Sequence, residues 1–185
     1  MTTVFIAGSI TIKRVDARVK ARIDNVVESG FDIVVGDADG ADTAIQFHLL
    51  DIGAKKATVY CSGPVPRNNV GGWPTHVVGT SSAPGSRAFF TAKDLQMARL
   101  ADFGLMVWDG KSTGTLSNVI ELLARKKKSV VYVHKAKVFK NVGTAEDLDL
   151  LTCCMSDHAR HRADEKIRLS ERLDALKHEQ ASIFA

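Results

Sequence analysis

The sequence predicts an α/β protein: a Rossmann-like parallel sheet flanked by helices, with a C-terminal helical extension. Two observations support this prediction. Short runs that are apolar on both sides alternate with amphipathic stretches through the first two-thirds of the 185 residues, and glycine-containing turns follow several of these runs. Strands that are apolar on both sides and separated by helices are typical of a parallel sheet covered on both faces.

The first two-thirds of the chain supplies these elements in alternating order. Apolar residues recur with a helical period from about Arg14 to Ser29 and over 41–52, so both segments are predicted helices. Predicted strands occupy 4–7, 33–35, 57–60, 105–108 and 130–133, and a further helix is expected near 115–127. Ligands of such sheets bind beyond the carboxyl ends of the strands, where the strand order switches direction.

The segment 62–86 interrupts the alternation. It contains all four prolines and shows no sustained period, which predicts a long loop that is either functional or disordered. Within it, Trp73 and residues 67–69 are candidates to stack on a base and to hydrogen-bond it. The alternative is that the tryptophan only pins the loop.

The chain changes character again after residue 133. The basic segment 135–140 is a candidate for one added strand, and from about Thr144 onward apolar residues with helical spacing lie among many charges. We therefore expect a nucleotide-binding domain over 1–143 and the helical extension over 144–185. The extension either packs on the core or pairs two protomers.

Composition and charge exclude several classes of protein. No apolar run approaches the roughly 20 residues of a membrane helix. The N-terminus lacks the basic region of a signal peptide, so we expect a cytoplasmic protein without a membrane partner. The net charge of +4 permits an anionic partner. The densest basic run, Arg125 to Lys128, lies where a helix should end and favours its dipole; the alternative is a nucleic-acid patch.

The three cysteines do not have the spacing of metal ligands. We expect Cys61 to be buried at a strand end, and all three to be structural rather than catalytic. No metal site is predicted from them.

Three glycine-containing turns follow predicted strands, at 7–10, 36–42 and 109–115. Each places free backbone N–H groups at the start of a helix, an arrangement that binds phosphate. None fits the dinucleotide or Walker patterns, but their joint occurrence predicts one shared ligand cleft. The predicted ligand-binding residues are Gly8, Ser9, Gly36, Asp37, Asp39, Gly40, Asp42, Arg87, Asp109, Gly110, Lys111, Ser112, Thr113, Gly114 and Thr115.

The second and third turns differ in charge. In the third turn, Lys111 is placed to neutralise a phosphate, and the hydroxyls are hydrogen-bond donors. The carboxylates of the second turn would repel a phosphate. They are expected to hold ribose hydroxyls, to cap the helix, or to recruit a divalent cation such as magnesium. Arg87, just before a helix, is a further candidate to face the phosphate.

These motifs resemble those of the SLOG superfamily, which joins the lysine-decarboxylase-like phosphoribohydrolases, the DNA-processing protein A family and the YspA- and YpsA-type proteins. The YspA-like branch has a first nucleotide-binding turn similar to residues 36–42, GDADGAD. The phosphoribohydrolases have an M-A-x-x-A-D helix end, a strand and a glycine-rich turn, which resemble residues 93–123. The opening residues FIAGSI also resemble the nucleoside 2-deoxyribosyltransferase-like fold. The resemblance covers about residues 3–133.

The chain departs from the phosphoribohydrolase pattern at its catalytic positions. The resemblance places a catalytic glutamate where this chain has Asn118, and a functional arginine where it has Lys93. An amide is neither a carboxylate nucleophile nor a general base at neutral pH. Glu121, one helical turn further on, is a candidate to supply the missing carboxylate; the alternative is an ion-paired surface role.

The sequence therefore predicts a sensing or binding module for a nucleotide-derived ligand of ribose-phosphate type. The alternative is an enzyme that cleaves or transfers at the N-glycosidic bond of nucleoside monophosphates. Its catalytic candidates are Glu121, Asn118 and Lys93, and the working carboxylate is either Glu121 or one of Asp37, Asp39 and Asp42. A nucleic-acid-processing role is a third hypothesis. We do not expect it, because aromatic residues make up only 6% and no basic stripe is present. The family and the charged tail indicate a homodimer.

Overall fold

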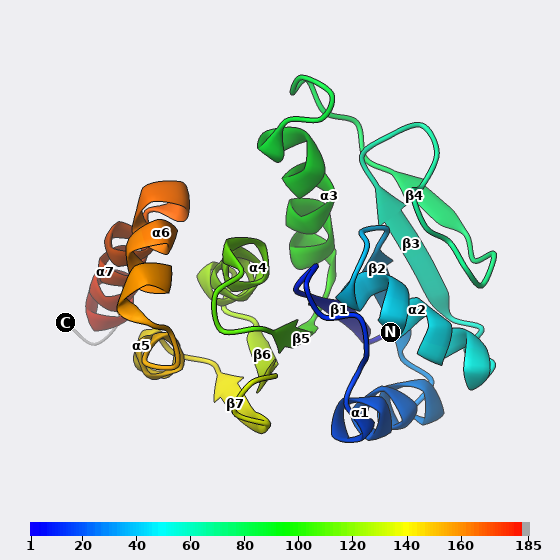
Figure 1. The fold of residues 1–185 in the computed structure, drawn as a ribbon, viewed down its shortest axis with the longest axis horizontal. Helices are drawn as coiled ribbons and strands as arrows, with labels where there is room; N and C mark the ends of the chain where they lie inside the picture. Colours follow the sequence, from blue (N-terminus) through cyan, green and yellow to red (C-terminus); the bar gives the residue numbers. More distant parts are fainter. Residues whose placement is uncertain (183–185) are drawn as a thin grey trace.

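The computed structural model describes residues 1–182 and contains a single seven-stranded sheet (Figure 1). Its strand order is β4-β3-β2-β1-β5-β6-β7, and every neighbouring pair is parallel except β6 and β7. The strands are β1 (Thr3–Gly8), β2 (Asp32–Gly36), β3 (Ala57–Cys61), β4 (Thr75–Val77), β5 (Phe103–Trp108), β6 (Lys128–Val133) and β7 (Val138–Val142). This architecture confirms the predicted α/β, Rossmann-like fold class.

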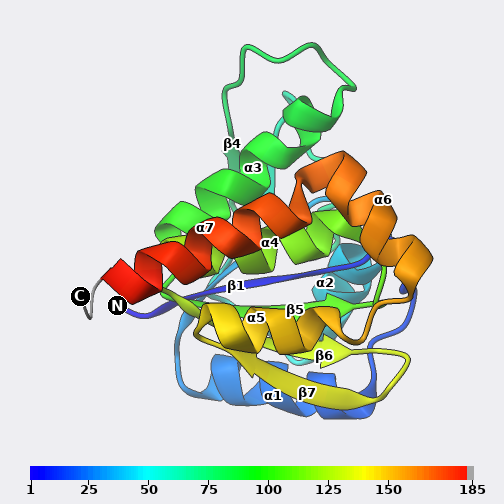
Figure 2. The same ribbon diagram turned by 90° about the vertical axis from the view of Figure 1, so that its left-hand side faces the viewer.

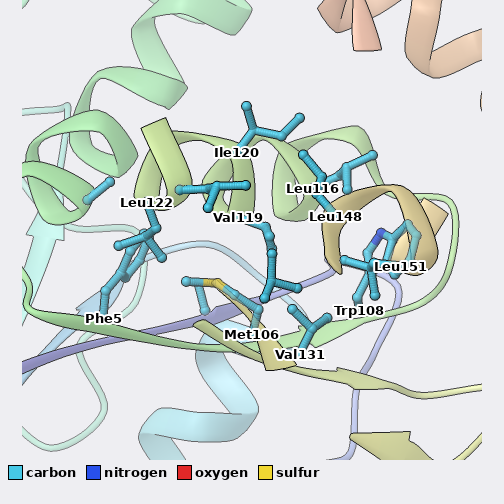
Figure 3. Packing of buried hydrophobic residues seen from close by; sticks show 14 of the residues in the cluster. Phe5, Met106, Trp108, Leu116, Val119, Ile120, Leu122, Val131, Leu148 and Leu151 are labelled. Carbon is cyan, nitrogen blue, oxygen red and sulfur yellow. The ribbon is translucent and has the colours of Figure 1, made fainter. Parts of the chain in front are cut away.

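Helices cover both faces of this sheet. They are α1 (Ala17–Glu28), α2 (Ala41–Asp51), α3 (Arg87–Leu100), α4 (Thr113–Ala124), α5 (Ala145–Thr152), α6 (Asp157–Ile167) and α7 (Leu169–Ser182). One buried cluster joins the sheet to α1 and α2, and a second joins its other face to α3, α4 and the C-terminal helices. Figure 3 shows Phe5, Met106 and Val131 of the sheet packed beneath Val119 and Leu122 of α4.

The path of the chain creates a switch point beside β1. From this central strand the chain proceeds through β2, β3 and β4 on one side, then returns to form β5 on the other. The chain therefore leaves the carboxyl ends of β1 and β5 in opposite directions along the sheet. In open α/β sheets, ligands bind in the crevice at such a point.

Two short strands were not predicted as they occur. The predicted loop 62–86 contains β4, which pairs with β3. Tyr60 and His76 are partners in this pairing, and the centroids of their two rings lie 4.7 Å apart. The basic segment after residue 133 does form a strand, β7, but its antiparallel direction follows from the tight turn that joins it to β6.

The prediction for the basic run at 125–128 is confirmed for one residue and needs a correction for others. Arg125, the C-cap of α4, donates from Nη1 to the Glu121 carbonyl of its own helix at 2.7 Å, as expected. Lys127 Nζ donates instead to the carbonyls of Ala98 and Arg99 at the end of α3, at 3.1 and 2.6 Å, and Lys128 already belongs to β6. The run thus serves two helix ends, whose free carbonyls carry the same partial negative charge.

The C-terminal helices share the core of the sheet domain. Leu169, Leu173 and Leu176 are buried in the same cluster as α3 and α4. Figure 2 shows α7 running alongside α4, where Arg172 donates to Ser117 and Glu121. Hydrophobic packing therefore continues across the boundary that the sequence predicts at residue 144.

Candidate functional site

A cavity of about 420 Å³ lies at the switch point, at the carboxyl ends of β1 and β5. Its wall comes from three parts of the chain: the turn after β1, the turn after β5, and α6. The lining residues are Ile10, Thr11, Asp109, Lys111, Ser112, Thr113, Ser156, His158, Ala159, Arg162 and Lys166. The first and third predicted turns thus meet at one cavity, whereas none of its lining residues comes from the second turn.

Asp109 organises the turn after β5. Its Oδ1 accepts from the backbone N–H groups of Lys111 and Ser112, at 2.9 and 2.7 Å, and its Oδ2 accepts from the Thr11 hydroxyl at 2.7 Å. Burial raises the pKa of Asp109, but these hydrogen bonds outweigh burial and hold the pKa below its usual value. The ionised carboxylate therefore fastens the two turns that line the cavity. Gly110, at φ 82°, supplies the left-handed residue that this turn needs.

The N-terminus of α4 faces this cavity with unused donors. Ser112 is the N-cap, but its side chain makes no capping hydrogen bond. The first helical hydrogen bond runs from Leu116 N to Ser112 O. Among residues 1–182, no acceptor is found for the backbone N–H groups of residues 113–115. Such groups, together with the helix dipole, attract an anion.

Four cations surround this helix end. Lys111, Arg162 and Lys166 line the cavity, and Arg87 donates to Thr113 Oγ1 at 3.4 Å and to the Lys166 carbonyl at 3.3 Å. None of the four forms an ion pair with any residue that the structure describes. The only carboxylate in the lining belongs to Asp109, so the cavity carries an excess of positive charge.

The first turn acts as a structural link between the other two. Ser9 is fully buried, and its hydroxyl accepts from Asp109 N and contacts Thr115 Oγ1, both at 3.1 Å. Its N–H donates to the Val107 carbonyl. At Gly8, a Cβ atom would lie 2.6 Å from Ala41 Cβ. Neither residue leaves a free backbone donor at the cavity; the first turn contributes Ile10 and Thr11 instead.

The second turn is closed off by side chains from the long loop. Arg67 binds both oxygens of Asp37 through its guanidinium, and Asn68 Nδ2 donates to Asp39 Oδ1. Gly40, at φ 82°, lies directly against the backbone of Ile10. A Cβ added to Gly40 would be 2.1 Å from the Ile10 carbonyl oxygen. In the structure the Asp37 and Asp39 carboxylates of this turn therefore make internal contacts, and its ligand role stays a prediction.

A buried lysine lies between the carboxylates of the second turn and offsets their negative charge. Lys93, on α3, is 3% exposed; its Nζ lies 2.8 Å from Asp94 Oδ1, 3.8 Å from Asp37 Oδ1 and 4.0 Å from Asp42 Oδ2. Burial lowers the pKa of Lys93, but the three carboxylates outweigh burial and raise it. Burial raises the pKa of Asp42 to about 6, against the opposing effect of Lys93. Burial likewise raises the pKa of Asp37, but Arg67 and Lys93 bring it below its usual value.

The catalytic candidates do not converge. Lys93 belongs to the buried cluster just described. Arginines occupy both oxygens of Glu121: Arg125 donates to Oε2 and Arg172 to Oε1, so the ion-paired alternative is the one that the structure shows. Asn118 is 7% exposed, and its side-chain amide makes no hydrogen bond within residues 1–182. None of the three lines the switch-point cavity.

Trp73 has the pinning role that the sequence left as an alternative. The side chain is 8% exposed, and Nε1 donates to the Ala54 carbonyl at 2.7 Å. Asn69 holds the same loop through its bonds to Trp73. These contacts hold residues 69–73 of the loop against the domain, so this ring is not free to stack on a base.

Three further observations concern partners and ions. Within the described chain, no helix is long and apolar enough to cross a membrane. No group of three or more histidine, cysteine, aspartate or glutamate side chains in residues 1–182 is arranged to hold a metal ion. Cys61 is buried as predicted, while Cys153 and Cys154 are exposed.

Comparison with known proteins supports the fold. No family model matches the sequence, and no curated protein matches it. Among solved structures, the chain is similar to DNA processing protein A from Helicobacter pylori, a structure reported for its single-stranded DNA binding mode. The TM-score is 0.55 and the identity 19%, over 90% of this chain and 80% of that one. This likeness confirms a Rossmann-like fold.

The α6 contribution to the cavity was missed by sequence reasoning. Arg162 and Lys166 are four residues apart on α6 and thus on one face of it, but nothing in their local pattern marks them as binding residues. The Ser156 N-cap was an available signal for the start of the helix: its side chain accepts from Ala159 N at 3.2 Å. A second helix N-terminus therefore faces the same cavity as that of α4.

Proposed function

We propose that this protein binds a nucleotide or a nucleotide-derived ribose phosphate in the switch-point cavity, as a sensing or binding module. The observation that carries the proposal is the set of four unpaired cations around the unoccupied donors of the α4 N-terminus. The four side chains are exposed and have no internal anion, so an anionic ligand would complement their charge.

The shape and chemistry of the cavity support a ligand of this class. Its volume of about 420 Å³ falls within the range of small-molecule sites. A phosphate at the α4 N-terminus would accept from backbone N–H groups and from Lys111, with Arg162 and Lys166 opposite. Asp109 Oδ1 already accepts two hydrogen bonds and Oδ2 one, which leaves one site on Oδ2 to accept from a ribose hydroxyl. The site thus offers donors for a phosphate and an acceptor for a sugar.

Glycosidic cleavage has less support from this geometry. Asn118 cannot act as the carboxylate of the phosphoribohydrolase route, and Glu121 is held by Arg125 and Arg172 instead of facing the cavity. We therefore propose binding without turnover. Incubation with nucleoside monophosphates should release no free base, and sustained release that Glu121→Gln abolishes would establish the enzyme instead.

Calorimetric titration tests the binding proposal. AMP and ADP-ribose should bind and raise the melting temperature, because a ligand selective for the folded state stabilises it, whereas adenosine should bind more weakly. Lys111→Gln and the double variant Arg162→Gln/Lys166→Gln should each lower affinity for the phosphate-bearing ligands about tenfold or more. Lys140→Gln removes an exposed cation outside the cavity and is the matched control. Equal affinity in all four proteins would refute the proposal.

Single-stranded nucleic acid is the second candidate ligand. It is favoured by the structural similarity to DNA processing protein A, whose reported structure concerns single-stranded DNA binding, and by the same unpaired cations. A short oligothymidylate should then bind with an affinity that falls steeply with salt concentration. Tight oligonucleotide binding without mononucleotide binding would favour this candidate. The homodimer remains a prediction, which light scattering after size exclusion would check. A magnesium requirement also remains a prediction.

A further inference from the structure

A second hollow lies between α1 and the amino ends of the central strands β1, β5 and β6. Its volume is about 290 Å³. Its apolar lining residues are Val4, Val26, Phe31, Phe103, Leu105 and Val130. We infer that this hollow is a separate binding site for an amphipathic organic anion, such as a medium-chain or aromatic carboxylate.

The strand register explains the apolar floor. Val4 of β1 pairs with Phe103 of β5, and Leu105 of β5 pairs with Val130 of β6. Because side chains alternate along a strand, Phe103 and Leu105 point to the same face, the one that α1 covers. The roof is Val26 of α1 together with the small residue Ser29, so helix and sheet do not meet closely here.

Cations flank the hollow. Arg22 and Lys128 both line it, and neither forms an ion pair with the residues described here. Arg22 lies over the Phe139 ring, 4.3 Å from its centroid. No carboxylate lines the hollow. An apolar cavity with two cations at its border that have no carboxylate partner complements a ligand that has an apolar body and an anionic head.

Exposure at the mouth supports an accessible site. Phe103 is 48% exposed, a large fraction for a phenylalanine next to buried core residues. A ligand seated in the hollow would cover part of this ring. The site is distinct from the switch-point cavity, because the two occupy opposite ends of β5. Six residue steps separate Phe103 from Asp109, which corresponds to about 20 Å along an extended strand.

Titration with decanoate and with uncharged decanol tests the inference. 8-Anilinonaphthalene-1-sulfonate serves as the fluorescent reporter that both compounds should displace. Arg22→Gln and Lys128→Gln should each weaken decanoate binding about fivefold and leave decanol unchanged, as expected for one exposed charge contact. Lys140→Gln, an exposed lysine that does not line the hollow, should change neither.

A second type of variant tests the apolar part of the site. Ser29→Trp places a large side chain at the mouth from an exposed position, so it should abolish binding of both compounds without entering the core. Saturating AMP should not displace the reporter. The inference is overturned if the wild-type protein does not bind decanoate saturably, or if neither charge variant alters its affinity. It is also overturned if the wild-type protein is a dimer that Phe103→Asp dissociates, because a second copy then covers this face.

Discussion

Asp42 provides a direct test of the buried charge cluster, because the fold disfavours its ionised form. The carboxyl is 4% exposed, and burial raises its pKa from 3.8 to about 6. A difference of about 2 pH units corresponds to about 3 kcal/mol. The folded state therefore binds the Asp42 proton more tightly than the unfolded state does. The stability that this protonation contributes is fully present below pH 4 and is lost as the pH rises through about 6.

Asp42→Asn replaces this carboxyl by a neutral side chain of the same shape that can still accept from Gly8 N. The variant should match the wild-type protein in stability near pH 4 and exceed it by about 3 kcal/mol at pH 7.5. Urea denaturation of both proteins at several pH values measures this. The difference between the two curves removes the opposite pH dependence of groups such as Asp37 and Asp109, whose pKa values are lowered.

The control for this experiment is Asp39→Asn, which changes an exposed carboxyl of the same turn that does not contact Lys93. Its difference from the wild-type protein should not grow between pH 4 and 6. If Asp42→Asn is less stable than the wild-type protein at pH 7.5, or if its stability difference is the same at every pH, the reasoning about the buried cluster is refuted.

Two further substitutions probe the same region. Lys93→Met leaves three carboxylates without their shared cation; it should lower the free energy of unfolding in urea by about 3–5 kcal/mol at pH 7.5, and a loss below 1 kcal/mol would contradict the assignment. Gly40→Ala forces a side chain into a left-handed position and against the Ile10 carbonyl; thermal denaturation should show a loss of about 1–3 kcal/mol. Gly79→Ala, where an added Cβ meets no atom within 4 Å, is its control and should be neutral.

Local patterns were sufficient to predict five of the seven strands, the helices α1, α2 and α4, and one side of the candidate site. The turn at 109–115 is defined by residues close in sequence: Asp109 accepts from the two backbone N–H groups that follow Gly110, and Thr113 begins α4. Such geometry depends on short-range hydrogen bonds and on glycine at positive φ. The sequence therefore indicated the donors of this turn directly.

The roles of charged side chains depended on partners that are distant in sequence. The sequence made Asp37 and Asp42 candidates for a ligand, and only the fold placed Lys93 between them. The sequence left Glu121 open between a catalytic and an ion-paired role, and only the packing of α7 brought Arg172 to it. The energy of a charge depends on its burial and on neighbours within a few ångströms. Neither quantity can be obtained from spacing along the chain.

The sequence alone determined that this chain alternates strands and helices around a two-faced sheet, because hydrophobic period and turn chemistry are local properties. Only the tertiary structure decided which turn is closed by internal contacts and which lines the switch-point cavity. It closed the second turn with Arg67 and Lys93 and completed the cavity at the third with Arg162 and Lys166 of α6. Those pairings arise when segments distant in sequence pack together, since packing sets which charges are neutralised and which still face solvent.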